Sequence, residues 1–238
     1  MKRFFTVVFI FFLVITLSVS GYCSPRYYHV KIKTNKGEIT LLLYNKTPLH
    51  RDNFVKLSKE GFFNGVLFHR VINEFMIQSG DPDSKERLPG KLYGDGGPEK
   101  NIPAEFVPEL FHKRGSLAAA REGDNVNPKR ESSGSQFYIV EGKIQDEETL
   151  KSAEKRINDR NEAIGIKSSY QFPEQIREYY KNIGGTPHLD TQYTVFGEVI
   201  SGINVVFEIS DSKTDSNDRP LEDIYIISTK VYKKRSKK

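Results

Sequence analysis

The sequence predicts a mainly β protein, either a closed barrel or a sandwich. Runs of β-branched and aromatic residues recur along the chain, and turns containing Gly, Pro and Asn separate them. Only a few stretches repeat apolar residues at helical spacing. With 238 residues, of which 37% are hydrophobic and 12% aromatic, the chain is long enough for one packed domain with additional segments. Many short strands with few helices are typical of both architectures.

The first expected elements are a hairpin and a helix. HVKIKT (29–34) and EITLLLY (38–44) are β-rich and flank a turn at Asn35-Lys36-Gly37. Thr47-Pro48 predicts the start of a helix, with the threonine hydroxyl as cap and proline at the first helical position. Gly61 is expected to end this helix.

The remaining barrel elements follow as short β-rich runs after this helix. The region from Asp81 to Asn101 is rich in Gly, Pro and charge and predicts a long loop, and 203–209 predicts a short helix. The expected strands are FHRVI (68–72), MIQSGD (76–81), GSLAAA (115–120), SQFYIV (135–140), YTVFGEVI (193–200) and DIYIISTKVY (223–232).

One region, 145–185, breaks this pattern because it is highly charged and predicts helices. Asp146 is placed to cap a first helix, Pro173 to start a second and Gly184 to end it. Two interpretations stay open. The segment is either a surface decoration or an insertion that packs on the barrel and shapes the site, through apolar residues at helical spacing: Ile176, Tyr179, Tyr180 and Ile183.

The N-terminus has the layout of a secretory signal. Lys2 and Arg3 precede an uncharged apolar run (4–20) that small residues close. We expect residues 1–23 to be a cleaved signal peptide; a retained anchor is the alternative, although the run is shorter than most spanning helices. Cys23, the only cysteine, is either incidental or the lipidated first residue of a lipoprotein.

The positive charge lies at the two ends of the chain. The formal net charge is +5, and seven positive charges come from Lys2, Arg3 and the basic tail (233–238), so the rest carries a net −2. No basic face is indicated, and we expect no nucleic-acid partner. The tail is expected to be a solvated end, with contact to anionic lipid or nucleic acid as the alternative.

Several catalytic chemistries find no support in the sequence. There is no G-x-S-x-G motif, no phosphate-binding loop and no dinucleotide-binding glycine pattern. The five histidines are scattered, and none has metal-ligand spacing with another histidine or with the cysteine. We therefore expect neither a metal nor a cofactor.

Three ordered motifs carry a resemblance to one family. They are FHRVINEFMIQSGD (68–81), GSLAAAREGD (115–124) with SSGSQFYIV (132–140), and TPHLDTQYTVFGEV (186–199). The chain resembles the cyclophilin-type peptidyl-prolyl cis-trans isomerases over residues 27–232, interrupted by the insertion 145–185. The resemblance implies a closed eight-stranded antiparallel β-barrel capped by two helices, with the site on the barrel's outer face.

The resemblance also implies roles for individual residues. The expected catalytic residues are Arg70, Gln78, which orients the arginine, and Phe75. Substrate contacts are expected at the walls of a proline pocket, at a glutamine and at an edge segment whose backbone pairs with the peptide: Phe75, Met76, Ala120, Arg121, Gln136, Phe137, Tyr138, His188, Leu189 and Tyr193. His188 stands where the best-known members have tryptophan, which implies weak cyclosporin binding. Ala119 replaces a frequent methionine.

The resemblance implies an isomerase that accelerates X-Pro bond rotation without a covalent intermediate. Together with the expected signal peptide, it predicts action on exported proteins during folding. Its partners would be proline-containing segments of client proteins, and the protein itself would be a monomer. We expect it in the periplasm or lipid-anchored to the cell envelope of a bacterium, with membrane contact only through an N-terminal lipid or an uncleaved signal. The alternative is a module that binds such peptides without turnover.

Overall fold

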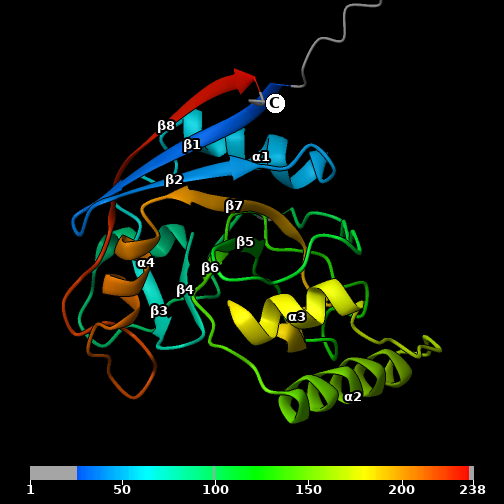
Figure 1. Ribbon diagram of the computed structural model, residues 1–238. Helices are drawn as coiled ribbons and strands as arrows, with labels where there is room; N and C mark the ends of the chain where they lie inside the picture. Colours follow the sequence, from blue (N-terminus) through cyan, green and yellow to red (C-terminus); the bar gives the residue numbers. More distant parts are fainter. Residues whose placement is uncertain (1–25, 99, 236–238) are drawn as a thin grey trace, which may run out of the picture.

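One eight-stranded antiparallel sheet forms the body of the protein (Figure 1), in a computed structural model that describes residues 26–98 and 100–235. The strands lie in the order β3-β4-β6-β5-β7-β2-β1-β8. The mainly β prediction is therefore confirmed. Their bounds are β1 (Arg26–Thr34), β2 (Glu38–Leu43), β3 (Phe68–Ile72), β4 (Met76–Ser79), β5 (Ser116–Ala119), β6 (Phe137–Val140), β7 (Val195–Ser201) and β8 (Ile226–Arg235).

The sheet is curled but open, so the expectation of a closed barrel is wrong. Its edge strands β3 and β8 meet near where they begin, through an isolated bridge between Leu67 and Tyr225 and a 2.8 Å hydrogen bond from the N–H of Phe68 to the carbonyl of Ile224. Ile226 of β8 also exchanges backbone hydrogen bonds with Gly65 at 2.7 Å and Val66 at 2.9 Å, just before β3. Further along β3, the N–H of Val71 donates to Asp218 in the loop before β8, at 2.8 Å. At this point the loop before β8, rather than β8 itself, lies beside β3.

Two helices pack on the barrel and two belong to the insertion. α1 (Pro48–Lys59) and α4 (Ile203–Ser210) cover the barrel core, whereas α2 (Glu147–Ala163) and α3 (Glu174–Asn182) lie together on one side of the molecule (Figure 1). Two short 3-10 helices complete the fold, η1 (Pro82–Glu86) and η2 (Pro187–Leu189).

The start of α1 is capped differently from the prediction. The hydroxyl of Thr47 makes no capping hydrogen bond. Instead, the carboxylate of Glu105 accepts from the backbone N–H groups of Leu49 at 3.1 Å and His50 at 3.0 Å, and also contacts the ring of His50 at 2.7 Å. A carboxylate is favourable at the positive end of a helix, so a distant residue replaces the local cap.

The barrel interior is apolar because alternate strand residues point inward. Ile32, Ile39 and Leu41 have no exposed surface. Phe54 of α1 closes the core by edge-to-face contact with Phe137, with ring centroids 5.2 Å apart. The sheet is thereby fixed as a rigid support for side chains on its outer face.

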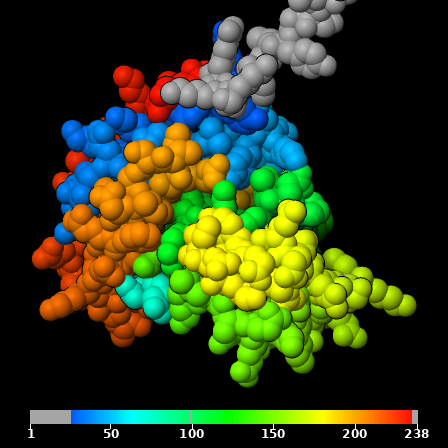
Figure 2. Space-filling view, viewed as in Figure 1, coloured from blue at the N-terminus to red at the C-terminus, as the bar shows by residue number. Residues whose placement is uncertain are grey.

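The insertion has a small core of its own. Asp146 caps α2 by accepting from the N–H of Thr149 at 2.7 Å, and Gly184 follows α3 with φ of +104°, as predicted. Ile183 is 43% exposed, so its predicted packing is wrong. Figure 2 shows the insertion at the surface, with α3 in yellow in front of the green strand region. Its buried residues are Leu150, Ala153, Ile157, Phe172, Ile176 and Tyr180.

Candidate functional site

A pocket of about 300 Å³ on the outer face of the sheet brings together most of the residues that the motifs single out. It draws on four separate parts of the chain: the β3–β4 hairpin, the loop after η1, the β5–β6 region and the segment around η2. Its lining residues are Arg70, Phe75, Met76, Gln78, Gly94, Asp95, Ala120, Arg121, Tyr138, Leu189 and Tyr193.

The floor of the pocket is apolar. Met76, Tyr138 and Leu189 are 2%, 4% and 6% exposed and pack in one cluster, separate from the barrel core. Strand alternation produces this arrangement: Met76 and Gln78 face outward on β4, whereas Ile77 between them has no exposed surface and belongs to the core. The floor suits a small apolar ring.

Phe137 does not line the pocket, so this part of the predicted site is wrong. Its ring is 1% exposed and lies in the barrel core, edge-on to Phe63 at 5.5 Å. Tyr138 on β6 and Gln136 just before it face outward and Phe137 faces inward, as the period of two requires. Tyr138 therefore occupies the wall position that the prediction gave to Phe137.

Arg70 borders the pocket from β3. Its side chain is 43% exposed, and its Nε lies 3.4 Å from a carboxylate oxygen of Asp218, which is 42% exposed. Exposed ion pairs of this kind contribute little to stability. The guanidinium is thus positioned beside the apolar floor while it is only weakly restrained.

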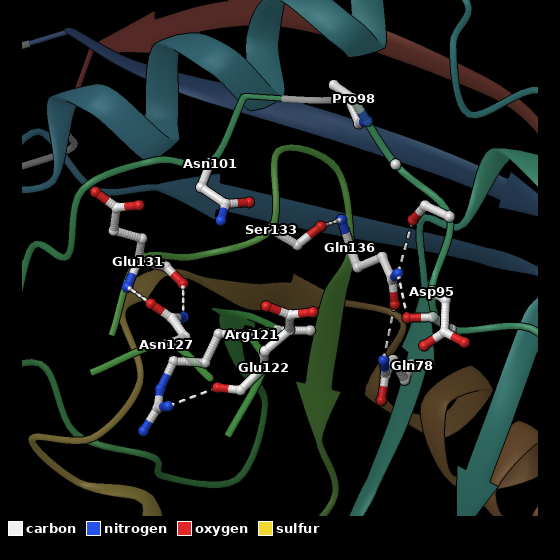
Figure 3. A pocket seen from close by; sticks show the side chains of 14 residues that line it. Gln78, Asp95, Pro98, Asn101, Arg121, Glu122, Asn127, Glu131, Ser133 and Gln136 are labelled. Carbon is white, nitrogen blue, oxygen red and sulfur yellow. Dashed lines mark hydrogen bonds between the residues drawn. The ribbon is translucent and has the colours of Figure 1, made fainter. Parts of the chain in front are cut away.

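Gln78 does not hydrogen-bond to Arg70, although the two residues are paired across β3 and β4. Its side-chain amide donates to the Oε1 of Gln136 at 3.0 Å. Gln136 in turn donates to the carbonyls of Gly94 at 2.7 Å and Gly96 at 2.8 Å (Figure 3). The described contacts therefore give Gln78 a role in fixing the 94–96 loop, and its orientation of Arg70 remains a prediction.

Ala120 and Arg121 were predicted to pair with the peptide through their backbone, but the backbone of Ala120 is already hydrogen-bonded within the protein. The N–H of Ala120 donates to Gln136 at 3.0 Å, and its carbonyl accepts from Ser133 at 2.8 Å. Among the hydrogen bonds of the described residues, none uses the backbone of Arg121. Pairing with an extended peptide would thus fall to Arg121, whose guanidinium is held over the ring of Tyr193 at 4.5 Å.

His188 stands at the rim rather than in the pocket. Its ring stacks on Phe75 with centroids 5.6 Å apart and planes 29° apart. Burial, together with nearby Arg156, lowers the pKa of His188 to about 4, so the ring is neutral near pH 7. His188 therefore extends the apolar surface of Phe75 at this pH.

A second cavity, of about 410 Å³, is shown in Figure 3. It adjoins the first and shares five lining residues with it: Gln78, Gly94, Asp95, Ala120 and Arg121. Gln136, which was predicted for the site, lines this second cavity instead. Acidic side chains also surround it, from Asp95, Glu122 and Glu131. An extended peptide in the first pocket could continue into the second.

Neither a metal site nor a membrane-crossing helix is found among the described residues. No three His, Cys, Asp or Glu side chains in 26–98 and 100–235 come close enough together to hold a metal ion. None of the helices in these two ranges combines the length and the apolar character needed to cross a membrane. The predicted signal and Cys23 lie outside the described residues.

Sequence reasoning missed the residues that back the site. Asp218 reaches Arg70 from 148 positions away, and Asp95 comes from the long loop after η1. His112 is buried behind Tyr138 and hydrogen-bonds to its hydroxyl at 2.9 Å. None of these positions shows a local pattern that distinguishes it from a surface or loop residue.

Comparisons with known proteins agree with this geometry. Residues 29–231 match the model of the family described as cyclophilin type peptidyl-prolyl cis-trans isomerase/CLD. A putative peptidyl-prolyl cis-trans isomerase of Staphylococcus epidermidis is 36% identical over 203 residues, which cover 85% of this chain and 90% of the relative. A putative bifunctional phosphatase/peptidyl-prolyl cis-trans isomerase of Streptococcus pyogenes is 35% identical over 91% of this chain, which spans 40% of that longer protein.

The solved structures show the same fold. A cyclophilin type peptidyl-prolyl cis-trans isomerase of Cryptosporidium parvum superposes with a TM-score of 0.59 at 24% identity, covering 87% of this chain and 98% of its own. A structure of the same protein in the presence of the dipeptide Ala-Pro gives a TM-score of 0.58 at 24% identity, with coverage of 86% and 98%.

Proposed function

The chain belongs to the cyclophilin-type peptidyl-prolyl cis-trans isomerases, and we propose that it uses the pocket between Arg70 and Tyr138 to accelerate X-Pro bond rotation in exported client proteins. One observation carries the assignment of the site: a guanidinium borders an apolar floor formed by Met76, Tyr138 and Leu189. A proline ring fits such a floor, and the adjacent peptide bond would then lie next to Arg70.

The chemistry explains why these residue types suffice. Rotation about a peptide bond is opposed by about 18–20 kcal/mol of amide resonance. In the twisted amide the proline nitrogen regains its lone pair, which accepts a hydrogen bond from a guanidinium. Arg70 would therefore stabilise the twisted state more than the planar one, which lowers the barrier. This route forms no covalent intermediate.

Isomerisation of a short Ala-Pro peptide by the purified chain, followed by NMR exchange between the cis and trans signals, tests this proposal. We expect exchange to accelerate in proportion to protein concentration, without added metal or cofactor. Peptide binding with no acceleration would instead identify the chain as a binding module, and absence of both would contradict the assignment of the pocket.

Export is the second part of the proposal, and the sequence of residues 1–23 supports it. β1 begins at Arg26, so cleavage near Cys23 would leave the isomerase domain whole. Mass spectrometry of the mature N-terminus after cell fractionation separates the alternatives. A diacylated Cys23 would identify an envelope lipoprotein, an unmodified shortened chain a periplasmic protein, and a full-length chain in the membrane a retained anchor. A full-length chain in the cytosol would contradict export.

A further inference from the structure

A chain of buried hydrogen bonds runs from the insertion to the pocket floor. The hydroxyl of Tyr180 on α3 donates to Oδ2 of Asp190 at 2.7 Å. Oδ1 of Asp190 lies 2.8 Å from Nδ1 of His112, and Nε2 of His112 lies 2.9 Å from the hydroxyl of Tyr138. These four side chains, at most 4% exposed, are called the relay below.

The hydrogen-bond partners assign the protons of the relay. The backbone N–H of His112 also donates to Oδ1 of Asp190, at 2.8 Å, so this carboxylate accepts at both oxygens. A carboxylate next to Nδ1 favours a proton there, which leaves the lone pair of Nε2 to accept from Tyr138. Burial raises the pKa of both tyrosine hydroxyls, so both remain donors near neutral pH.

The relay joins three separate parts of the molecule. Tyr180 belongs to the insertion, Asp190 directly follows Leu189 of the pocket floor, and Tyr138 lies on β6. Each polar group in the relay is buried, so removing any one leaves its neighbour with one hydrogen bond fewer at a buried position. The last donor in the series, Tyr180, comes from outside the barrel.

We propose that Tyr180 is a positioning residue for the proline pocket. Through Asp190 and His112 it fixes the ring of Tyr138, and through the backbone of Asp190 it fixes Leu189. The insertion thereby sets how tightly the proline ring is held, while Arg70 on the opposite wall lies outside the relay. This inference rests on the proposed isomerase function and gives the insertion a defined part in it.

The decisive variant is Tyr180→Phe, because it removes only the hydroxyl. We expect the KM for Ala-Pro peptides to rise about three- to tenfold, the cost of one buried hydrogen bond, while kcat stays within about twofold. Tyr179→Phe is the matched control: it is the neighbouring residue on α3, and its hydroxyl makes no hydrogen bond among the described residues. An unchanged KM in folded Tyr180→Phe would overturn the proposal.

A double-mutant cycle tests the route of the effect. In a Tyr138→Phe background the relay no longer reaches the pocket, so Tyr180→Phe should cause no further rise in KM. An equal rise in both backgrounds would show that Tyr180 acts through general stability and would overturn the relay. If Tyr180→Phe does not fold, the ¹⁵N shifts of the His112 ring in the wild-type protein decide: protonated Nδ1 supports the relay, and protonated Nε2 overturns it.

The two proposals can fail separately. A wild-type chain without turnover would contradict the isomerase function, and the same variants would then be compared by the Kd of an Ala-Pro peptide from NMR titration. Weaker binding by Tyr180→Phe alone would still support the relay, and equal binding would overturn it. An active wild type with an unaffected Tyr180→Phe variant would overturn the relay only.

Discussion

The two walls of the pocket are built in opposite ways. On the β3–β4 wall, Arg70 is 43% exposed and meets one carboxylate, that of Asp218, at 3.4 Å. On the β6–η2 wall, Tyr138 is 4% exposed and is backed by His112 and Asp190 through bonds of 2.8–2.9 Å. The charged group is free to adjust, whereas the apolar floor is fixed.

This difference suits rotation about an X-Pro bond, in which the residue before proline turns while the proline ring stays bound. The proline ring must stay in place while the preceding residue rotates, so a fixed floor is useful there. The guanidinium has to meet a nitrogen whose lone pair develops only during rotation. Arg70 can leave Asp218 for this nitrogen at little cost, because exposed ion pairs contribute only about 0–1 kcal/mol.

The two carboxylates behind the walls should differ most in their effect on stability. Asp190→Ala leaves the hydroxyl of Tyr180 and two N–H groups of His112 buried without their acceptor. Each buried unsatisfied donor costs about 1–3 kcal/mol, so we expect the free energy of unfolding to fall by about 3 kcal/mol or more. Asp218→Ala, the matched control, should cost less than about 1 kcal/mol. Urea unfolding of both variants measures this, and similar losses would contradict the contrast between the walls.

For catalysis, in contrast to stability, the larger effect should come from the exposed wall that carries Arg70. Arg70→Ala removes the donor expected to stabilise the twisted amide, and we expect kcat/KM to fall about 10²–10³-fold with the fold retained. Arg70→Lys, which keeps the charge but loses the planar fork, should recover only part of the rate. The NMR exchange assay measures both variants, and an unchanged rate in folded Arg70→Ala would remove Arg70 from the mechanism.

Acid should weaken the fold through two histidines near the pocket, His69 and His188. Burial lowers the pKa of His69, next to Arg70 on β3, and that of His188 to about 4 each. The unfolded chain takes up these protons near pH 6.5 and the folded chain only near pH 4. Stability therefore falls as the pH drops through this window, with a limiting slope of about 1.4 kcal/mol per pH unit for each histidine.

Urea unfolding of the wild type and His188→Phe at pH 7 and pH 5 isolates one of these contributions. The phenyl ring keeps the stacking on Phe75 but has no proton to gain, so the variant should lose less stability on acidification. Equal losses in both proteins would mean that the pKa of His188 is not lowered.

The smallest expected effect concerns the contact between the walls. His188 belongs to η2 but stacks on Phe75 of the other wall, at 5.6 Å. His188→Trp adds apolar area and an indole N–H at this rim, so cyclosporin inhibition should tighten about tenfold while peptide turnover changes little. Titration of the isomerase activity with cyclosporin measures this, and tight inhibition of the wild type would show that histidine serves equally well.

The sequence predicted those parts of the molecule that follow from local pattern. Runs of β-branched and aromatic residues between turns located most strands, and the motif around Arg70, Phe75 and Met76 located one pocket wall. Alternation alone would also have separated Tyr138 from Phe137, because neighbouring residues on a strand face opposite sides. The motif assigned both residues to the pocket, and only the structure corrected it.

The remaining features depend on contacts between distant segments. Glu105 replaces Thr47 as the cap of α1, and the carbonyl of Asp218, in the loop before β8, accepts from the N–H of Val71 on the edge strand β3. His112 and Tyr180 look like an isolated histidine and one of two adjacent tyrosines until the fold brings them to Asp190. Sequence periodicity does not identify such pairs, because each residue taken alone is also compatible with a surface position.

The insertion contacts the rest of the domain at a second place, through Asn161 of α2, and this contact bears on whether the insertion could be lost. Asn161 of α2 accepts from Arg130 at 2.7 Å and from the side chain of Gln192 at 3.1 Å, and all three are at most 7% exposed. Deleting the insertion would leave Arg130 and Gln192 of the barrel with lost partners, in addition to Asp190. Loss of the insertion would therefore cost the rest of the domain several buried hydrogen bonds, unless these residues were replaced at the same time.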